Sequence, residues 1–269
     1  MNCNEIKRII TDNLSATCKD FEVLVMPEID STNDEIKRRA SCQNEGFTVI
    51  ALSQTKGRGR RGRCFFSPGG NSLYMSILLK PQSDINSIIN VTSAAAVSVY
   101  DAILQTCGID TDIKWVNDIY LNGRKVCGIL TEAVLSNSIN NAAMTQYVVL
   151  GIGINVFKPK ESIPDDIKDK YGTIYDENTS DASLIACLAA NTVNSFFGYY
   201  ANLNKKEYMD TYRSRSMLIG KYATYLSGNE MRRVFVNDID NDAHLIVTDE
   251  NGQKMSLCDG EITFVNLEK

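Results

Sequence analysis

The sequence has few of the residues on which several common enzyme sites depend. It contains one histidine, His244, in 269 residues, and its eight cysteines include no C-x-x-C pair. A single histidine argues against a histidine-based zinc site and against a Ser-His-Asp triad. The scattered cysteines, together with an N-terminus that lacks the apolar core of a signal peptide, predict a cytoplasmic protein with reduced thiols.

Long apolar runs and an excess of positive charge are also missing. No uninterrupted apolar run approaches the roughly 20 residues that span a bilayer, so no membrane partner is expected. The formal net charge is −5, and a negative protein repels polyanions at long range, so DNA is not expected as a partner either. The remaining composition, 43% hydrophobic and 23% charged, is typical of a globular protein with one large domain and a small companion.

Hydrophobic periodicity and helix caps predict a mixed α+β domain over residues 1–216. The expected helices cover residues 1–14, 30–40, 85–108, 184–203 and 206–215. The expected strands cover residues 21–26, 47–53, 72–80, 112–115, 120–135 and 147–156. Asn122-Gly123 is a strong hairpin-turn signal inside one of them. Residues 157–180 are predicted to form a long polar loop, and loops of that length are usually functional or mobile.

The C-terminal residues, 217–269, have a different texture. Five short alternating segments are separated by Ser-Gly-Asn, Asn-Asp, Asn-Gly and Asp-Gly turns. The segments are 221–227, 231–239, 243–249, 254–258 and 261–267. Short strands at this spacing predict a second domain, a small closed β-barrel of the SH3-like type.

A Gly- and Arg-rich stretch, "GRGRRGR" at residues 57–63, contains a G-x-G-x-x-G pattern and allows three interpretations. A dinucleotide loop would open a helix, but here the glycines lead to Pro68 and then to a strand. A nucleic-acid patch could use stacking by Phe65 and Phe66, but its basic footprint is small for an acidic protein. A phosphate cradle fits glycine backbone and two-pronged arginine hydrogen bonds. In that case the four like charges repel one another, and we expect a loop that is mobile until an anion binds.

Three further motifs could supply partners for such a cradle, and each has a plainer structural explanation. "STN" (Ser31–Asn33) offers hydroxyls and an amide for a polar ring, or simply a helix N-cap. "KWVNDIYLNGRKVCGIL" gathers lysines, an asparagine and an aspartate around a turn, or is a hairpin with surface lysines. "GIGIN" at 151–155 either lines a ligand or allows tight sheet packing.

Taken in order, "STN", "Q-x-x-GRGRRGR", "KW-x-NDIYLNGRKVCGIL" and "GIGIN" closely resemble the motifs of biotin–protein ligases. The resemblance covers about residues 20–156, and the small C-terminal β domain also fits. It implies an α+β fold akin to the class II aminoacyl-tRNA synthetase and lipoate-ligase core, followed by the SH3-like barrel. Only 30 residues precede Ser31, so we expect a monofunctional type without a DNA-binding domain.

The resemblance also implies residue roles. The expected catalytic residues are Lys125, Arg58 and Arg60. The expected biotin-binding residues are Ser31, Thr32, Asn33, Gln54, Gly57, Arg58, Gly59, Arg60, Lys125 and Gly128. The expected ATP or adenylate contacts are Arg60, Arg61, Arg63, Lys114, Trp115, Asn117, Asp118, Gly151, Gly153 and Asn155. No structural metal is implied, whereas Mg²⁺ would accompany ATP, near Asp118, and the 157–180 loop resembles the segment that covers the adenine.

The implied activity is an ATP-dependent ligase that activates biotin as biotinyl-5′-AMP and transfers it to a lysine of a biotin carboxyl carrier protein. Such an enzyme is a monomer or a homodimer and keeps no bound cofactor. Two departures from the family pattern concern the lid: Val116 replaces a frequent proline, and Phe65 or Phe66 a tryptophan. Two alternatives stay open, a lipoate–protein ligase, whose relatives carry an R-R-x-x-G-G-G loop with a nearby histidine, and an RNA-binding module.

Overall fold

A mixed seven-stranded sheet forms the centre of the larger part of the protein. The structure, a computed structural model, describes residues 2–81, 88–136, 144–227, 230–258 and 262–264. The strands are β1 (Val23–Met26), β2 (Thr48–Ala51), β3 (Ser72–Leu79), β4 (Asp112–Lys114), β5 (Asp118–Leu121), β6 (Arg124–Ser136) and β7 (Met144–Asn155). They lie in the order β1-β2-β3-β7-β6-β5-β4, with β1 and β2 parallel and the other pairs antiparallel. The predicted mixed sheet is confirmed.

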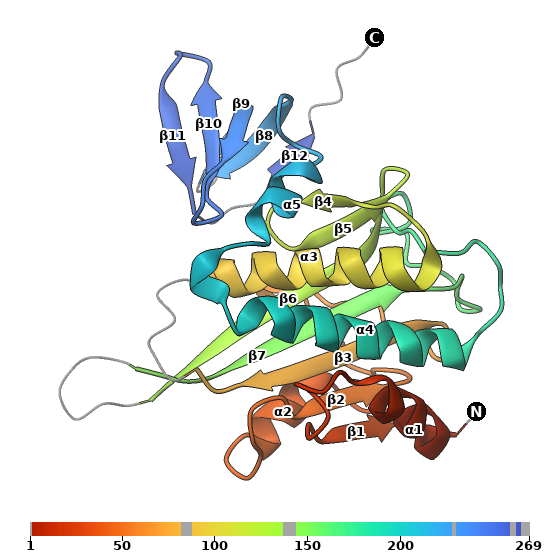
Figure 1. The fold of residues 1–269 in the computed structure, drawn as a ribbon. Coiled ribbons are helices and arrows are strands. Elements are labelled where there is room, and N and C mark those ends of the chain that lie inside the picture. Colours follow the sequence, from red (N-terminus) through yellow and green to blue (C-terminus); the bar gives the residue numbers. More distant parts are fainter. Residues whose placement is uncertain (1, 82–87, 137–143, 228–229, 259–261, 265–269) are drawn as a thin grey trace.

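Helices cover both faces of this sheet, but unequally. They are α1 (Cys3–Asn13), α2 (Thr32–Arg39), α3 (Ile88–Cys107), α4 (Ala182–Tyr200) and α5 (Met209–Ser214), with short 3₁₀ turns η1 (Arg60–Gly62) and η2 (Leu203–Lys205). α3 and α4 lie side by side across one face of the sheet (Figure 1). The expected helices are therefore confirmed, although the predicted start of α3 falls among residues 82–87, outside the described residues.

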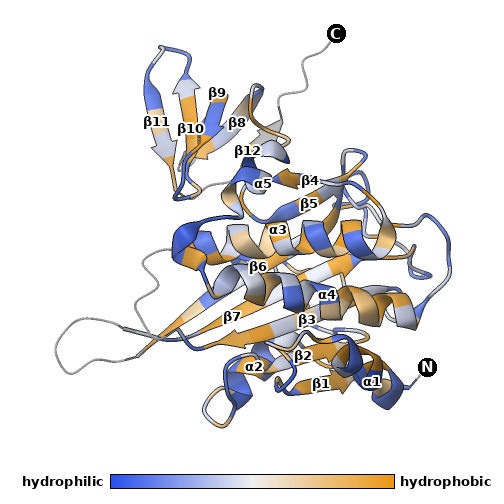
Figure 2. Ribbon diagram, viewed as in Figure 1, coloured by the Kyte–Doolittle hydropathy of each residue, from blue (hydrophilic) through white to orange (hydrophobic). Residues whose placement is uncertain are grey.

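The helix α3 shows that one statement from the sequence, that no segment is long and apolar enough to span a bilayer, was wrong. By length and composition alone this helix is apolar enough to cross a bilayer, and the search for uninterrupted apolar runs overlooked it. Most of it is buried inside the protein, where Val91, Val97 and Ile103 are fully covered. Figure 2 shows hydrophobic residues along β3, β6 and β7 and on parts of α3 and α4. Such burial is the environment of a core helix.

Side chains on successive strand residues point to opposite faces of the sheet, so each strand serves two environments. Ile50, Met75 and Ile152 belong to the large core under α3 and α4. On the other face, Val49, Leu78 and Val149 pack with Ile36 of α2 in a smaller cluster. Further along that second face, β6 and β7 carry glycines in place of large side chains. That part of the sheet is open to form a site.

The second sheet confirms the five predicted C-terminal strands. They are β8 (Tyr222–Ser227), β9 (Glu230–Ile239), β10 (Leu245–Asp249), β11 (Lys254–Leu257) and β12 (Ile262–Phe264). They form a small, barrel-like antiparallel sheet in the order β11-β10-β9-β8-β12. Val236 and Leu245 of this sheet belong to the same buried cluster as the larger sheet. The domain division at 216/217 stays a prediction.

The hairpin between β5 and β6 has the predicted turn. Asn122 and Gly123 have φ angles of 51° and 75°. Positive φ at both central residues is typical of the two-residue turn that matches strand twist, and asparagine and glycine tolerate it best. The turn brings β6 back along β5, so that Lys125 and Asp118 lie on adjacent strands.

Removing one buried side chain from the centre of the sheet tests this arrangement of faces. Leu150 on β7 is 0% exposed, so Leu150→Ala is expected to lower the free energy of unfolding by about 2–5 kcal/mol through lost burial and a cavity. Leu104 of α3 is 41% exposed, and Leu104→Ala is expected to change it by less than about 0.5 kcal/mol. Chemical denaturation measures both. Equal losses in the two variants would contradict the assignment of faces.

Candidate functional site

One cavity of about 610 Å³ on the open face brings together nearly all of the predicted site residues. It is lined by the end of the loop before α2, the Arg-rich loop, the β4–β5 connection, β6, β7 and part of the 157–180 loop. The predicted residues that line it are Ser31, Thr32, Asn33, Gln54, Arg58, Gly59, Arg60, Arg61, Arg63, Lys114, Trp115, Asn117, Asp118, Lys125, Gly128, Gly151, Gly153 and Asn155.

Gly57 is the exception, because it is not among the lining residues. A Cβ atom at Gly57 would lie 2.4 Å from both the Phe65 carbonyl oxygen and the Ser67 Oγ. Its backbone carbonyl also accepts a hydrogen bond from Phe65 N at 2.9 Å. Gly57 therefore lets the two arms of the Arg-rich loop approach each other.

Neutral polar groups form one end of the cavity. Ser31 caps α2, accepting a hydrogen bond from Asp34 N, which confirms the N-cap interpretation of "STN". It also lines the cavity, and its ligand-binding role stays a prediction. Gln54 Oε1 accepts from Thr32 N at 2.9 Å and from Thr32 Oγ1 at 3.1 Å. Gln54 Nε2 donates to Ser67 Oγ at 3.0 Å. These contacts fix donors and acceptors in a region without a formal charge.

A hydrogen-bonded chain joins this neutral end to a group of charges. Ser76 Oγ lies 2.7 Å from Thr32 Oγ1 and 2.5 Å from Asn33 Oδ1. Asn33 Nδ2 donates to Glu132 Oε2 at 2.8 Å. Because each member is bonded to the next, the orientation of α2 is tied to that of β3 and β6.

The arginine of the loop nearest this chain is paired with acids. Arg58 Nη1 lies 2.5 Å from Asp34 Oδ1, and Arg58 Nη2 lies 3.2 Å from Glu132 Oε1. Burial raises the pKa of Glu132, but hydrogen bonds from Asn33 and Lys37 outweigh it and leave that pKa below the ordinary value. The expectation of mutual repulsion counted only the loop's own charges and omitted these two carboxylates. It is wrong for Arg58.

Lys125 lies at the other side of the cavity, with its ammonium 2.7 Å from Asp118 Oδ1. Asp118 Oδ1 is buried, and the Lys125 ammonium is its ion-pair partner. The Lys125 backbone is held by Lys170 and Gly172, since Lys125 N donates to Lys170 O at 2.7 Å and Gly172 N donates to Lys125 O at 2.9 Å. The backbone of Lys125 is thus fixed and its side chain faces the cavity. The interpretation of this segment as a hairpin with surface lysines therefore does not describe Lys125.

Asn117 connects the Arg-rich loop to the sheet. Its Oδ1 accepts from Arg60 Nη1 at 3.1 Å, and its Nδ2 donates to Ile129 O at 2.8 Å. Trp115 is nearly buried, and the Trp115–Val116 peptide bond is cis. Within the described part of the chain, histidine, cysteine and acidic side chains form no group of three or more that could hold a metal ion.

Glycines make the floor of the cavity. A Cβ atom at Gly151 would lie 2.1 Å from Asn33 Oδ1, and one at Gly153 would lie 2.5 Å from the Phe65 ring. Gly128 pairs with Gly153 across β6 and β7, and a Cβ there would lie 3.0 Å from the same ring. The glycines therefore leave room for Asn33 and Phe65, and the tight-packing interpretation of "GIGIN" is part of how the site is built.

The 157–180 loop adds side chains that the sequence argument did not name, namely Asp166, Ile167, Lys170 and Tyr171. Asn155 Oδ1 is buried without a hydrogen-bond partner. Burial raises the pKa of Tyr171 to about 12, while a hydrogen bond with the Ser72 side chain lowers it, so the hydroxyl keeps its proton at neutral pH. One buried acceptor beside the cavity thus lacks a protein partner.

Asp34 and Glu132 were also missed. A period of two along β6 would have found Glu132, because Gly128, Leu130 and Glu132 share one face of the strand. Asp34 sits in the first turn of α2, where an acid is commonly explained by the helix dipole alone. That ordinary explanation concealed its pairing with Arg58.

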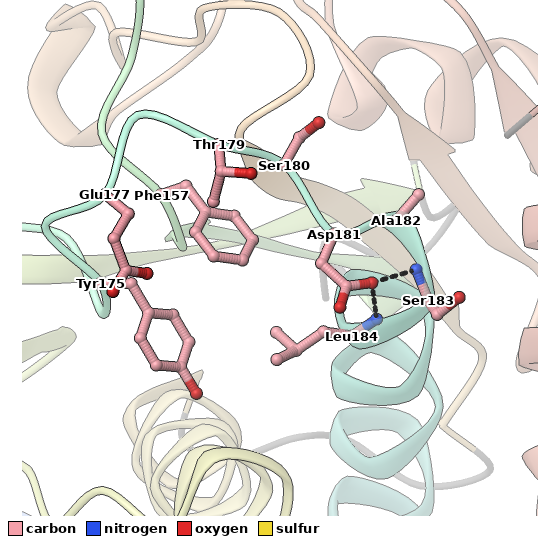
Figure 3. Close-up of a pocket in the computed structure, with 9 residues that line it drawn as sticks. All are labelled: Phe157, Tyr175, Glu177, Thr179, Ser180, Asp181, Ala182, Ser183 and Leu184. Atoms are coloured by element: carbon pink, nitrogen blue, oxygen red, sulfur yellow. Dashed lines mark hydrogen bonds between the residues drawn. The ribbon is translucent and has the colours of Figure 1, made fainter.

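A second hollow, of about 590 Å³, lies where α4 begins. Figure 3 shows the Asp181 carboxylate turned back to the helix, where it accepts hydrogen bonds from Ser183 N and Leu184 N at 2.9 and 3.0 Å. The Phe157 and Tyr175 rings stack at its side. Because a carboxylate already holds the helix N-terminus, this hollow gives no argument for a second anion site.

Comparison with known proteins identifies the class to which this site belongs. Residues 25–155 match the Biotin/lipoate A/B protein ligase family and form a domain of that family. The chain is 34% identical to the bifunctional ligase/repressor BirA of Escherichia coli over 207 residues, which are 74% of this chain and 63% of the relative. It is 27% identical to the biotin--[acetyl-CoA-carboxylase] ligase of Mycobacterium tuberculosis, over 95% of this chain and 94% of that protein.

A solved structure agrees with these sequence matches. The biotin protein ligase of Aquifex aeolicus, in complex with biotin and ATP, superposes with a TM-score of 0.72 and 26% identity, covering 90% of this chain and 97% of that one. The chain spans 37% of the length of the BirA relatives from Bacillus and 63% of that from E. coli. The fold and the ligase-family domain follow from these matches.

The glycine floor can be tested by filling it. Gly153→Ala should overlap the Phe65 ring and lower the free energy of unfolding by about 1–3 kcal/mol. Phe65→Ala removes the ring, so Gly153→Ala should cost less in that background. Gly198→Ala on α4, where a Cβ meets nothing within 4 Å, is the matched control and should be neutral or stabilising. Additive losses for Gly153→Ala and Phe65→Ala, measured by chemical denaturation, would contradict the contact.

Proposed function

We propose that this protein is an ATP-dependent ligase that activates biotin as biotinyl-5′-AMP and transfers it to a lysine of a biotin carboxyl carrier protein. The observation that carries the proposal is one cavity that combines neutral polar groups with cations. Ser31, Thr32 and Gln54 supply the neutral groups, while Lys125 and the loop arginines supply positive charge. Arg58 lies close to the neutral groups, since it pairs with Asp34 and Glu132. The ligase-family domain and the similarity to a ligase seen with biotin and ATP support it.

The neutral end suits the ureido ring of biotin, which needs donors and acceptors but no counter-charge. We assign Ser31, Thr32, Asn33 and Gln54 to the ring and place the valeryl chain over Gly128, beside Phe65. At the charged end, Arg58, Gly59, Arg60 and Lys125 would surround the biotin carboxylate and the α-phosphate. Guanidinium groups suit both anions because they form two-pronged hydrogen bonds with either.

The nucleotide would occupy the rest of the cavity. We assign Arg61, Arg63, Lys114, Asn117 and Asp118 to the phosphates and their Mg²⁺, which enters as part of the ATP substrate. Gly151 and Gly153, which the resemblance puts on that side, abut Asn33 and Phe65, the groups that we assign to biotin. We assign Asn155 to the nucleotide side, with Trp115 at its edge. The unpartnered Asn155 Oδ1 supports this placement, because a purine amino group would satisfy an acceptor.

The chemistry needs no nucleophile from the enzyme. In the first half, a biotin carboxylate oxygen attacks the α-phosphorus, and the bond to the β-phosphate oxygen breaks to release pyrophosphate. In the second half, the acceptor amine attacks the biotinyl carbonyl, loses a proton, and AMP leaves. Lys125 and the arginines offset the repulsion between two anions and the charge that develops at phosphorus. Substrate anions would compete with Asp118 for Lys125 and with Asp34 and Glu132 for Arg58.

Three further features belong to the proposal. The acceptor is a carrier-protein lysine, the protein is a monomer or a homodimer, and the reaction takes place in the cytoplasm, where the eight free cysteines stay reduced. The proposal includes no DNA-binding role, although the Bacillus and E. coli relatives are named ligase/repressors. Residues 1–216 would carry the reaction and residues 217–269 the accessory sheet.

Biotin-dependent exchange of pyrophosphate into ATP tests the first half-reaction. The wild type should show exchange with biotin, and Lys125→Ala should fold normally but lose on the order of 100-fold or more of that rate. Lys221→Ala, which changes a lysine outside the cavity lining, is the control and should keep the wild-type rate. Near-normal exchange by Lys125→Ala would contradict its role. Exchange with lipoate and not with biotin would move the assignment to the lipoate branch.

Limited proteolysis tests closure of the Arg-rich loop. Trypsin should cut after the arginines of residues 57–63 in the free protein and much more slowly with biotin and ATP together, because the adenylate neutralises and orders the loop. Biotin alone should protect less. Identical cleavage with and without both substrates would refute closure.

A further inference from the structure

The connection between β4 and β5 is supported from behind by the C-terminal third of the chain. Residues 114–117 bring Lys114, Trp115 and Asn117 to the cavity wall. The side chain of Asn117 bridges Arg60 and the Ile129 carbonyl, so the position of this connection also sets that of Arg60. A shift of the connection would therefore move the polar groups on the proposed nucleotide side together.

Tyr212 of α5 supplies the first support. Its side chain is 0% exposed, and its hydroxyl donates to the Val116 carbonyl at 2.9 Å. Burial raises the pKa of Tyr212, with Tyr208 and Asp118 raising it further, so the phenol remains a neutral donor. A buried hydrogen bond of this kind fixes the carbonyl, because neither partner can exchange it for water.

Trp115 supplies the second support, and here the connection is the hydrogen-bond donor and the C-terminal part of the chain is the acceptor. Its indole Nε1 donates to the Ala243 carbonyl at 2.8 Å. Ala243 is buried in a turn that is itself fixed, since Asp240 Oδ1 accepts from Asp242 N and His244 N, each at 2.9 Å. The indole therefore bonds to a carbonyl whose position does not depend on the cavity.

Backbone bonds continue the same support into β4. Ile113 N donates to Arg215 O at 2.8 Å, and Met217 N donates to Ile113 O at 3.0 Å. Residues 212–217 and the turn at 240–244 thus hold both the strand and the connection that follows it. Ile262 of β12 also reaches the cavity lining.

We propose that Tyr212 and the Trp115 indole N–H are positioning groups for the nucleotide side of the site. They set the place of residues 114–117 against Arg60, and so determine the affinity for MgATP with little effect on biotin. This inference rests on the proposed ligase function. The physical reason is that charge stabilisation falls steeply when donors move by about 1 Å from the productive geometry.

Conservative variants test the proposal. Tyr212→Phe and Trp115→Phe each remove one hydrogen bond and keep an aromatic ring. Each should raise the KM for MgATP in biotin-dependent exchange roughly three- to tenfold, as expected for loss of one hydrogen bond, and leave the KM for biotin within about twofold. Tyr200→Phe is the control, because the partly buried Tyr200 donates to Glu45 Oε1 at 3.3 Å outside the cavity lining. It should lose comparable thermal stability without a change in either KM.

A double-mutant cycle distinguishes positioning from general damage. If Tyr212 acts through the connection, Tyr212→Phe should raise the KM for MgATP much less in an Asn117→Ala background. Full additivity, equal rises in both KM values, or variants whose KM values match those of Tyr200→Phe would each overturn the inference. A wild type without biotin-dependent exchange would instead refute the proposed function. If the wild type is active and the KM for MgATP is unchanged in Tyr212→Phe and Trp115→Phe, the positioning role alone is refuted.

Discussion

The site depends on the missing side chains of three glycines in the middle of a buried sheet. Gly128, Gly151 and Gly153 lie on the face of β6 and β7 that α3 and α4 do not cover. Any side chain there would overlap Asn33, Phe65 or Lys125. Because these positions are empty, a helix start and a flexible loop can approach the sheet and enclose a cavity. Everything else in the site is arranged around that space.

The second constraint is electrostatic. The protein collects cations on one side of the cavity and gives them carboxylates of its own, Asp34 and Glu132 for Arg58 and Asp118 for Lys125. Exposed or half-exposed ion pairs of this type are weak, so an anion with better geometry can replace them. Such pairing keeps an acidic protein's basic loop folded near the site and still available to substrate. It explains why strong positive charge and flexible backbone occur together in residues 57–63.

Much of this was predictable from the sequence, and the exceptions have physical causes. Periodicity found the helices because each buries one face, and the central strands β2 and β3 were found as short apolar runs because both of their faces are buried. Asn122-Gly123 fixed a turn that only such residues adopt easily. The motifs located most of the cavity lining because ligand chemistry restricts residue type. Gly57 lies outside the cavity lining, because a glycine required for backbone packing has the same sequence signature as one required for a ligand; its binding role stays a prediction. Tyr212 and the Trp115–Ala243 contact are products of tertiary packing, for which no local pattern exists.

The central claim is that the neutral and the cationic ends of one cavity hold the two ends of a single acyl-adenylate. The most direct measurement is a crystal structure with a non-hydrolysable biotinyl-adenylate analogue. The account predicts the ureido ring beside Thr32 and Gln54, with Lys125 Nζ and at least one loop arginine within hydrogen-bond distance of the acyl-phosphate linkage. An analogue that binds elsewhere would contradict the account. So would an analogue that contacts neither Lys125 nor Arg58 while the Lys125–Asp118 and Arg58–Asp34 ion pairs persist.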